Sequence, residues 1–221
     1  MISNVLFSAR HAYDLAAAGY DQRPWQEFWR LNEFPVLIDW LRLGRGPILD
    51  AGAGTGLYVK ALVQAGTWAV GLDISSAMLQ QATDHSRVPL CLVQGDARKL
   101  PFASGSFGQV LFARVLSQID DLSSLLSESA RVLKRSGSLL LSDLDPDHPY
   151  MRTELPVGDG KIPVQTYKRP LRQIVREATR HGFALERSAV LVSSGANMPG
   201  SSRDSPLDRR VAFLARFIRE R

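Results

Sequence analysis

The sequence predicts an α/β fold in a single domain. Short apolar runs typical of buried strands alternate with amphipathic stretches typical of helices, and a glycine-rich turn follows the first of these runs. A length of 221 residues fits one such domain with additions and is enough to bury a sizeable core. No internal repeat and no second domain is expected.

The first predicted strand ends at residues 48–49 and leads into Asp-x-Gly-x-Gly-x-Gly, with glycines at Gly52, Gly54 and Gly56. A helix is predicted over residues 57–65. A glycine turn between strand and helix lets a ligand approach the backbone, and the start of the helix offers free N–H groups. The dinucleotide-binding pattern G-x-G-x-x-G does not match, because Leu57 stands where its third glycine would be. The Gly-Lys-Ser/Thr of a phosphate-binding loop is absent.

Residues 1–45, which precede this strand, predict a helical cap. Pro24 can begin one helix, and Pro35 is expected to restart the chain as a second helix that Gly44 ends. No apolar run here is long enough for a signal peptide, and none elsewhere approaches membrane-spanning length, so a soluble cytoplasmic protein is expected.

Composition excludes two kinds of site. The single cysteine, Cys91, leaves no internal disulfide and no cysteine zinc site, and its apolar surroundings predict a buried position; no metal is expected.

Net charge is uneven, at −2 over residues 1–151 and +7 over residues 152–221. The basic third could face nucleic acid or an anionic carrier, but no aromatic residues interleave the arginines as a base-stacking platform requires, so a solvated surface is favoured.

The remaining elements follow in order. A strand over residues 68–72 ends at Asp73, and a carboxylate about 20 residues past a glycine turn can accept hydrogen bonds from both ribose hydroxyls. Ser75 can cap the next helix, and Asp120 a later one. Further strands are predicted over residues 89–93, 106–114, 138–144, 183–192 and 211–218, with a helix opened by Pro170 and a lid or substrate insertion over 151–167.

Three motifs, each after a separate strand, resemble those of the class I S-adenosylmethionine-dependent methyltransferases of the small-molecule, type 11-like kind. The glycine turn resembles motif I, Asp73-Ile-Ser-Ser-Ala-Met78 resembles D-x-S-x-x-M-L, and Gly95-Asp96-Ala97 with Leu100-Pro101-Phe102 resembles G-D-A-x-x-L-P-F. The resemblance implies a doubly wound, mostly parallel seven-stranded sheet of order 3-2-1-4-5-7-6, with the last strand antiparallel. It also implies S-adenosyl-L-methionine as the cofactor.

The same resemblance implies the binding residues. Asp73 would hold the ribose, Ile74 and Met78 would pack on the adenine, Asp96 would accept from its amino group, and the N–H of Ala97 would donate to a ring nitrogen. The complete expected cofactor-binding set is Asp50, Ala51, Gly52, Gly54, Gly56, Asp73, Ile74, Met78, Gly95, Asp96, Ala97, Ala113 and Arg114.

The chain departs from the family where a histidine pair is common, because Ser117-Gln118 stands there. A base would therefore come from elsewhere, and His148, in a loop after the fifth strand, is the candidate. Tyr-Asp pairs occur at Tyr13-Asp14 and Tyr20-Asp21. A similar Tyr-Asp precedes the core in many small-molecule methyltransferases, so Tyr20 is expected to act in catalysis; packing is the alternative.

The expected division of the domain is a cap (1–45), a cofactor-binding half (46–145), a lid or substrate insertion (146–167) and the rest of the sheet (168–221). The expected function is methyl transfer to an O or N nucleophile of a small-molecule substrate by in-line displacement, with secondary metabolism as one setting. The alternatives are an RNA or protein methyltransferase that uses the basic third, or a non-catalytic cofactor-binding subunit. Neither nucleic acid nor membrane is a favoured partner, and a homodimer is left open.

Overall fold

The computed structural model describes residues 6–148, 154–158, 160–193 and 209–220. Its helices are α1 (Ala9–Ala16), η1 (Ala17–Gln22), α2 (Pro24–Phe28), η2 (Trp29–Glu33), α3 (Phe34–Arg42), α4 (Leu57–Gln64), α5 (Ser76–Asp84), η3 (Leu116–Gln118), α6 (Leu122–Val132) and α7 (Leu171–Arg180). Its strands are β1 (Ile48–Ala51), β2 (Ala69–Asp73), β3 (Cys91–Gln94), β4 (Phe107–Ala113), β5 (Leu133–Leu144), β6 (Glu154–Val157), β7 (Gly160–Pro163), β8 (Phe183–Ser193) and β9 (Arg209–Arg219).

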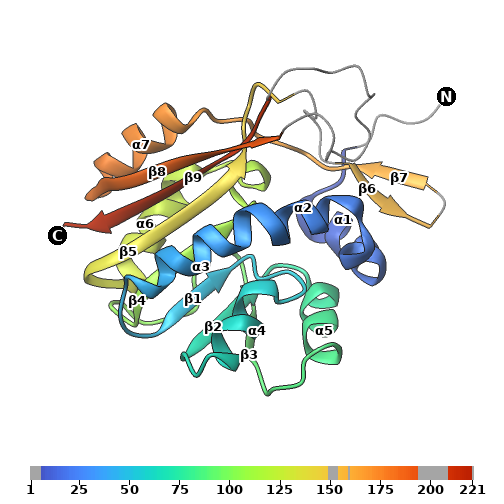
Figure 1. The fold of residues 1–221 in the computed structure, drawn as a ribbon, viewed down its shortest axis with the longest axis horizontal. Coiled ribbons are helices and arrows are strands. Elements are labelled where there is room, and N and C mark those ends of the chain that lie inside the picture. Colours follow the sequence, from blue (N-terminus) through green and yellow to red (C-terminus); the bar gives the residue numbers. More distant parts are fainter. Residues whose placement is uncertain (1–5, 149–153, 159, 194–208, 221) are drawn as a thin grey trace.

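One seven-stranded sheet runs through the molecule in the order β3-β2-β1-β4-β5-β9-β8 (Figure 1). The neighbouring pairs from β3 to β5 are parallel, whereas β9 is antiparallel to both β5 and β8. The expected order and the antiparallel last strand are therefore confirmed, with β8 and β9 as the sixth and seventh strands of the sheet. They carry the labels β8 and β9 because a separate two-stranded hairpin, β6-β7, precedes them in the chain.

The core has two layers because successive side chains of a strand point to opposite faces. Leu49 of β1 packs in one apolar cluster with α6 and α7, while its neighbour Ile48 packs in another with α3 and α4. Strands β1 and β4 are buried along their whole length. Strands β1 and β4 are thus covered on both sides, and the carboxyl ends of the parallel strands meet at one edge.

The segments before β1 and after β5 meet at that edge (Figure 1). Ala12 and Ala16 of α1 pack with Leu155 of β6 and with Val164, and Phe7 forms a parallel bridge to Val164. Phe28 and Trp29 pack on the start of β9. The cap and the hairpin therefore lie side by side over the functional edge of the sheet.

Two details of the elements differ from the sequence-based expectation. The chain does not restart at Pro35, since it is helical from Pro24 to Arg42, with a π-helical segment at η2 just before the proline. The wider π turn removes the need for the proline N–H. Strand β5 begins at Leu133 rather than Ser138, directly after α6.

Two side-chain expectations are also corrected. Asp121, not Asp120, caps α6 by accepting a hydrogen bond from the Ser124 N–H at 3.0 Å. Cys91 is exposed rather than buried, because β3 is the edge strand and is only partly covered. Ser75 does cap α5 as expected, with the Met78 N–H at 3.1 Å from its Oγ. In the part of the chain that the structure describes, no helix has the length and apolar character to cross a membrane.

Candidate functional site

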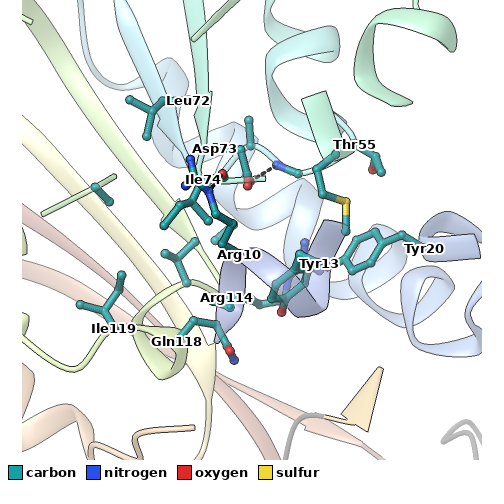
Figure 2. Close-up of a pocket in the computed structure, with 18 of the residues that line it drawn as sticks. Arg10, Tyr13, Tyr20, Thr55, Leu72, Asp73, Ile74, Arg114, Gln118 and Ile119 are labelled. Carbon is teal, nitrogen blue, oxygen red and sulfur yellow. Dashed lines mark hydrogen bonds between the residues drawn. The ribbon is translucent and has the colours of Figure 1, made fainter. Parts of the chain in front are cut away.

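A cavity of about 440 Å³ lies between the carboxyl ends of the parallel strands and the helical cap. This volume falls in the usual range for small-molecule sites. Figure 2 shows its wall, with Asp73 and Ile74 on the sheet side and Tyr13 and Tyr20 on the cap side. Eleven of the expected site residues line it: Tyr20, Gly52, Gly54, Asp73, Ile74, Met78, Gly95, Asp96, Ala97, Ala113 and Arg114.

Four expected site residues are not among the residues that line this cavity: Asp50, Ala51, Gly56 and His148. Asp50 is buried in β1, where its carboxylate accepts a hydrogen bond from the Val59 N–H at 3.2 Å. Burial raises the pKa of Asp50 to about 7. It supports the start of α4 from behind the cavity wall.

His148 also lies away from the cavity. Its side chain is 2% exposed, and its ring meets Trp25 edge-on with ring centres 6.1 Å apart. Its backbone N–H donates to the Asp145 carbonyl, which closes a tight turn after β5. The catalytic role of His148 stays a prediction, and this packing does not bring the imidazole into the cavity.

The glycine turn forms the cavity floor. Gly52 and Gly54 have φ of +86° and +54°, a conformation that favours glycine. A Cβ on Gly52 would lie 2.3 Å from a methyl carbon of Val115, whereas a Cβ on Gly54 would meet no atom within 4 Å. Gly52 is thus required by packing, while Gly54 leaves open space beside the backbone at the cavity.

Asp73 ends β2 with its carboxylate fixed by two backbone donors. The Gly54 N–H donates to Oδ2 at 2.8 Å (Figure 2), and the Ser75 N–H donates to Oδ1 at 2.9 Å. Burial raises its pKa, although these hydrogen bonds oppose the shift. Each carboxylate oxygen keeps further acceptor capacity for a ligand hydroxyl.

Asp96 is held by a neighbour that the sequence analysis did not single out. Arg98 binds both carboxylate oxygens of Asp96, with its Nη2 2.7 Å from Oδ2, and reaches Asp120 at 2.6 Å. The Arg98 guanidinium lowers the pKa of Asp96. The pKa of Asp120 is lowered by a hydrogen bond from the Asp121 N–H and by Arg98. Asp96 is therefore an ionised acceptor fixed at the cavity edge.

In each of the two Tyr-Asp pairs of the cap, the tyrosine lines the cavity and the aspartate forms a hydrogen bond to another loop. The rings of Tyr13 and Tyr20 lie 6.0 Å apart at the cavity, and burial raises the pKa of Tyr13, so its phenol stays protonated. Asp14 accepts from the Ser75 hydroxyl at 2.6 Å, and Asp21 accepts from the Thr55 hydroxyl at 2.7 Å. Each aspartate thus ties the cap to one of the two loops that carry the cofactor motifs.

A buried ion pair closes the cavity at the end of β4. Arg114 has φ of +61°, and its Nη1 lies 3.3 Å from Oε2 of Glu33, which is fully buried. The guanidinium also lies over the ring of Trp29 at 5.0 Å. Burial alone would lower the pKa of Arg114, but the Glu33 carboxylate together with Tyr20, Tyr58 and Tyr13 more than reverses this, so the charge persists. No motif in the sequence signals Glu33, which lies in the π-helical segment.

The comparisons with known proteins agree with this geometry. Residues 49–141 match the family model described as "Methyltransferase domain". The chain is similar to the demethylmenaquinone methyltransferase of Mycobacterium marinum, with 39% identity over 104 residues, 47% of this chain and 44% of the relative. It is also similar to the malonyl-[acyl-carrier protein] O-methyltransferase of Legionella pneumophila, with 35% identity over 114 residues, 50% of this chain and 40% of the relative. The match thus spans less than half the length of either relative.

Among solved structures, an S-adenosylmethionine-dependent methyltransferase from Mesorhizobium loti superposes with a TM-score of 0.67 at 21% identity, covering 85% of this chain and 97% of that one. A methyltransferase from Methanosarcina mazei gives a TM-score of 0.66 at 18% identity, covering 84% of this chain and 97% of that one. At these identities the likeness concerns the fold.

Proposed function

We propose that this chain transfers a methyl group to an O or N nucleophile of a small molecule, because residues 49–141 match a methyltransferase domain and the fold resembles that of an S-adenosylmethionine-dependent methyltransferase. The observation that carries the proposal is the cavity, which joins three cofactor motifs on one side to a polar cap on the other. The substrate and the activity of the whole protein belong to this proposal.

S-adenosylmethionine is the cofactor of this family, and two features of the cavity fit it. The carboxylate of Asp73 is aimed by two backbone N–H groups, as an acceptor for ribose hydroxyls should be. The open space at Gly54 lets a ligand reach the backbone. Ile74 and Met78 would cover the adenine, and Asp96 would accept from its amino group.

When bound, the cofactor supplies a methyl group already activated by a positively charged sulfur. The chain then has to hold donor and acceptor in line and exclude water, which supplies much of the rate enhancement in such reactions. The cap supplies that enclosure through Tyr13 and Tyr20, and Asp14 and Asp21 keep it in place. In this proposal Tyr20 orients the acceptor.

A small-molecule acceptor is favoured over RNA or protein because residues of the cap and of the segment after the hairpin, including Gln165 and Tyr167, line the cavity. The proposed division into cap, cofactor half, insertion and remaining sheet follows these contacts. Tight RNA binding that weakens steeply with salt in a filter assay would favour the alternative instead.

The direct test is release of S-adenosylhomocysteine from S-adenosylmethionine in the presence of a panel of acids, phenols, alcohols and amines, followed by mass spectrometry of the methylated product. We expect turnover with at least one small acceptor. Binding of S-adenosylhomocysteine without turnover on any acceptor would favour a non-catalytic cofactor-binding subunit.

A further inference from the structure

The guanidinium of Arg114 faces the cavity with hydrogen-bonding capacity left over. Its side chain is 17% exposed and lines the cavity (Figure 2). Its Nε and Nη1 are shielded from water and donate a hydrogen bond to no residue that the structure describes. Buried donors without acceptors are costly, and a left-handed backbone at a residue other than glycine is a further cost typical of functional sites.

Glu33 neutralises this arginine without using its donors. Oε2 of Glu33 accepts from the Tyr58 hydroxyl at 3.0 Å, and Oε1 accepts from the Ser142 hydroxyl at 2.7 Å. The contact with Arg114 is therefore an ion pair without hydrogen-bond geometry. A guanidinium pairs strongly with a carboxylate, so a carboxylate in the cavity would pair with the exposed part of this side chain.

The lining of the cavity also indicates how the acceptor is activated. None of the described residues that line it is a histidine, lysine, cysteine or glutamate. Its four aspartates are engaged: Asp21 by Thr55, Asp73 by backbone N–H groups, and Asp96 and Asp120 by Arg98. Phenols and ammonium groups must lose a proton during methylation, whereas a carboxylic acid is already ionised at neutral pH.

Resting on the proposed function, we infer that the acceptor is a small carboxylic acid, bound as its carboxylate by Arg114 and methylated on a carboxylate oxygen. One oxygen receives the guanidinium N–H groups while the other attacks. The attacking oxygen gains the methyl carbon, the carbon–sulfur bond breaks, and its electron pair stays on sulfur. The products are a methyl ester and S-adenosylhomocysteine, and no proton is released, so no base is required.

The test measures binding in the absence of turnover. With the protein saturated by S-adenosylhomocysteine, titration calorimetry compares benzoate with benzamide and hexanoate with hexanamide, which differ in charge but little in shape. We expect one acid to bind at least about tenfold more tightly than its amide. The double variant R114Q/E33Q, which avoids leaving a buried charge unpaired, should erase that preference. R42Q, on the exposed end of α3, is the matched control.

A second arm separates the acceptor's carboxylate from that of the cofactor. S-adenosylhomocysteine carries an amino-acid carboxylate that 5′-methylthioadenosine lacks, and the ratio of their affinities should be the same in the wild-type protein and in R114Q/E33Q. A collapse of that ratio would show that Arg114 binds the cofactor instead, and would overturn the inference. If the double variant does not fold, R114K keeps the charge but loses the fork, and should reduce the acid preference severalfold.

Three other outcomes are decisive. Binding of S-adenosylhomocysteine with no acid preferred over its amide would overturn the inference and leave the proposed function standing. An acid preference that survives R114Q/E33Q would also overturn it. Failure of S-adenosylhomocysteine to bind at all would overturn both.

Discussion

The two sides of the cavity are built in different ways. On the sheet side the ligand-facing groups are backbone atoms and short side chains, such as Gly54 and Asp73, that backbone hydrogen bonds fix at strand ends. On the cap side they are long side chains held by other side chains, such as Tyr20 beside Arg23, and the cap residue Glu33 also holds Arg114 at the end of β4. Groups fixed by the backbone suit a cofactor that many proteins share. Long side chains can be substituted without changing the backbone, so they suit an acceptor that differs from one protein to the next.

The largest expected effect tests the sheet side at Gly54. Gly54→Val should lower the affinity for S-adenosylhomocysteine at least about a hundredfold, because a branched side chain would enter the open space and disfavour φ of +54°. Titration calorimetry gives the affinity, and circular dichroism checks the fold. Gly66→Val, also at positive φ with open space but outside the cavity lining, is the control. A folded Gly54→Val protein with normal affinity would place the cofactor elsewhere.

A smaller loss is expected at Asp73. Asp73→Ala removes a hydrogen-bond acceptor from a largely buried site and should weaken S-adenosylhomocysteine binding by about 1–3 kcal/mol. The variant also frees the N–H groups of Gly54 and Ser75, so part of the loss comes from the loosened turn. Adenine alone, which lacks ribose, should bind the variant and the wild-type protein similarly. An equal loss for both ligands would mean that Asp73 only shapes the turn.

This contrast explains what could be predicted from the sequence. The strand order was predictable through the resemblance to a known family, and the glycine turn, Asp73 and Asp96 were predictable because they belong to local motifs that follow predicted strands. The partner of Arg114 was not, since Glu33 meets it only after the cap folds over the sheet. The same holds for Arg98, whose pairing with Asp120 joins two separate loops.

The misplaced details have a similar origin. Pro35 predicts the start of a new helix. The helix instead continues through a π-helical segment just before the proline, and residues on both sides of that segment are packed in the core. His148, predicted as a base from its place after a strand, is buried against Trp25, and its catalytic role stays a prediction. The role of Tyr20 stays a prediction, and the sequence analysis did not foresee that Asp14 and Asp21 would hydrogen-bond Ser75 and Thr55.

These hydrogen bonds give the third prediction. Asp14→Ala leaves the Ser75 hydroxyl and the Ala77 N–H without this acceptor and should loosen the cap. We expect cofactor affinity to fall about three- to tenfold, and hydrogen exchange to rise in residues 9–22 with little change in β1 and β4. Asp39→Ala, which removes only an exposed pair with Arg42, should change neither measurement. Unchanged exchange in α1 would show that apolar packing alone holds the cap.

Two buried carboxyl groups give the fourth prediction. Burial raises the pKa of Asp50 to about 7 and that of Asp143 to about 6, both above the unfolded value of roughly 4. The folded state therefore holds more protons between these values, and the stability from these groups is full below pH 4 and lost as pH rises to 6–7. Urea unfolding of Asp50→Asn against wild type should show this as a difference on the order of 2 kcal/mol between pH 5 and pH 7.5. Parallel pH profiles would mean that Asp50 is ionised throughout.

The smallest effect on catalysis is expected at His148. If the acceptor enters already ionised, no residue needs to remove a proton, and an imidazole packed on Trp25 outside the cavity lining has no chemical task. His148→Ala should then keep turnover within about threefold of wild type at saturating acceptor, and the rate should stay flat as pH rises above the range where the acid ionises. His148→Phe, which keeps an aromatic ring against Trp25, separates lost packing from lost chemistry because it should restore any stability that alanine removes. A general base would give the opposite result, with turnover reduced about 10²–10⁴-fold in both variants and an acidic limb near neutral pH only in the wild-type protein.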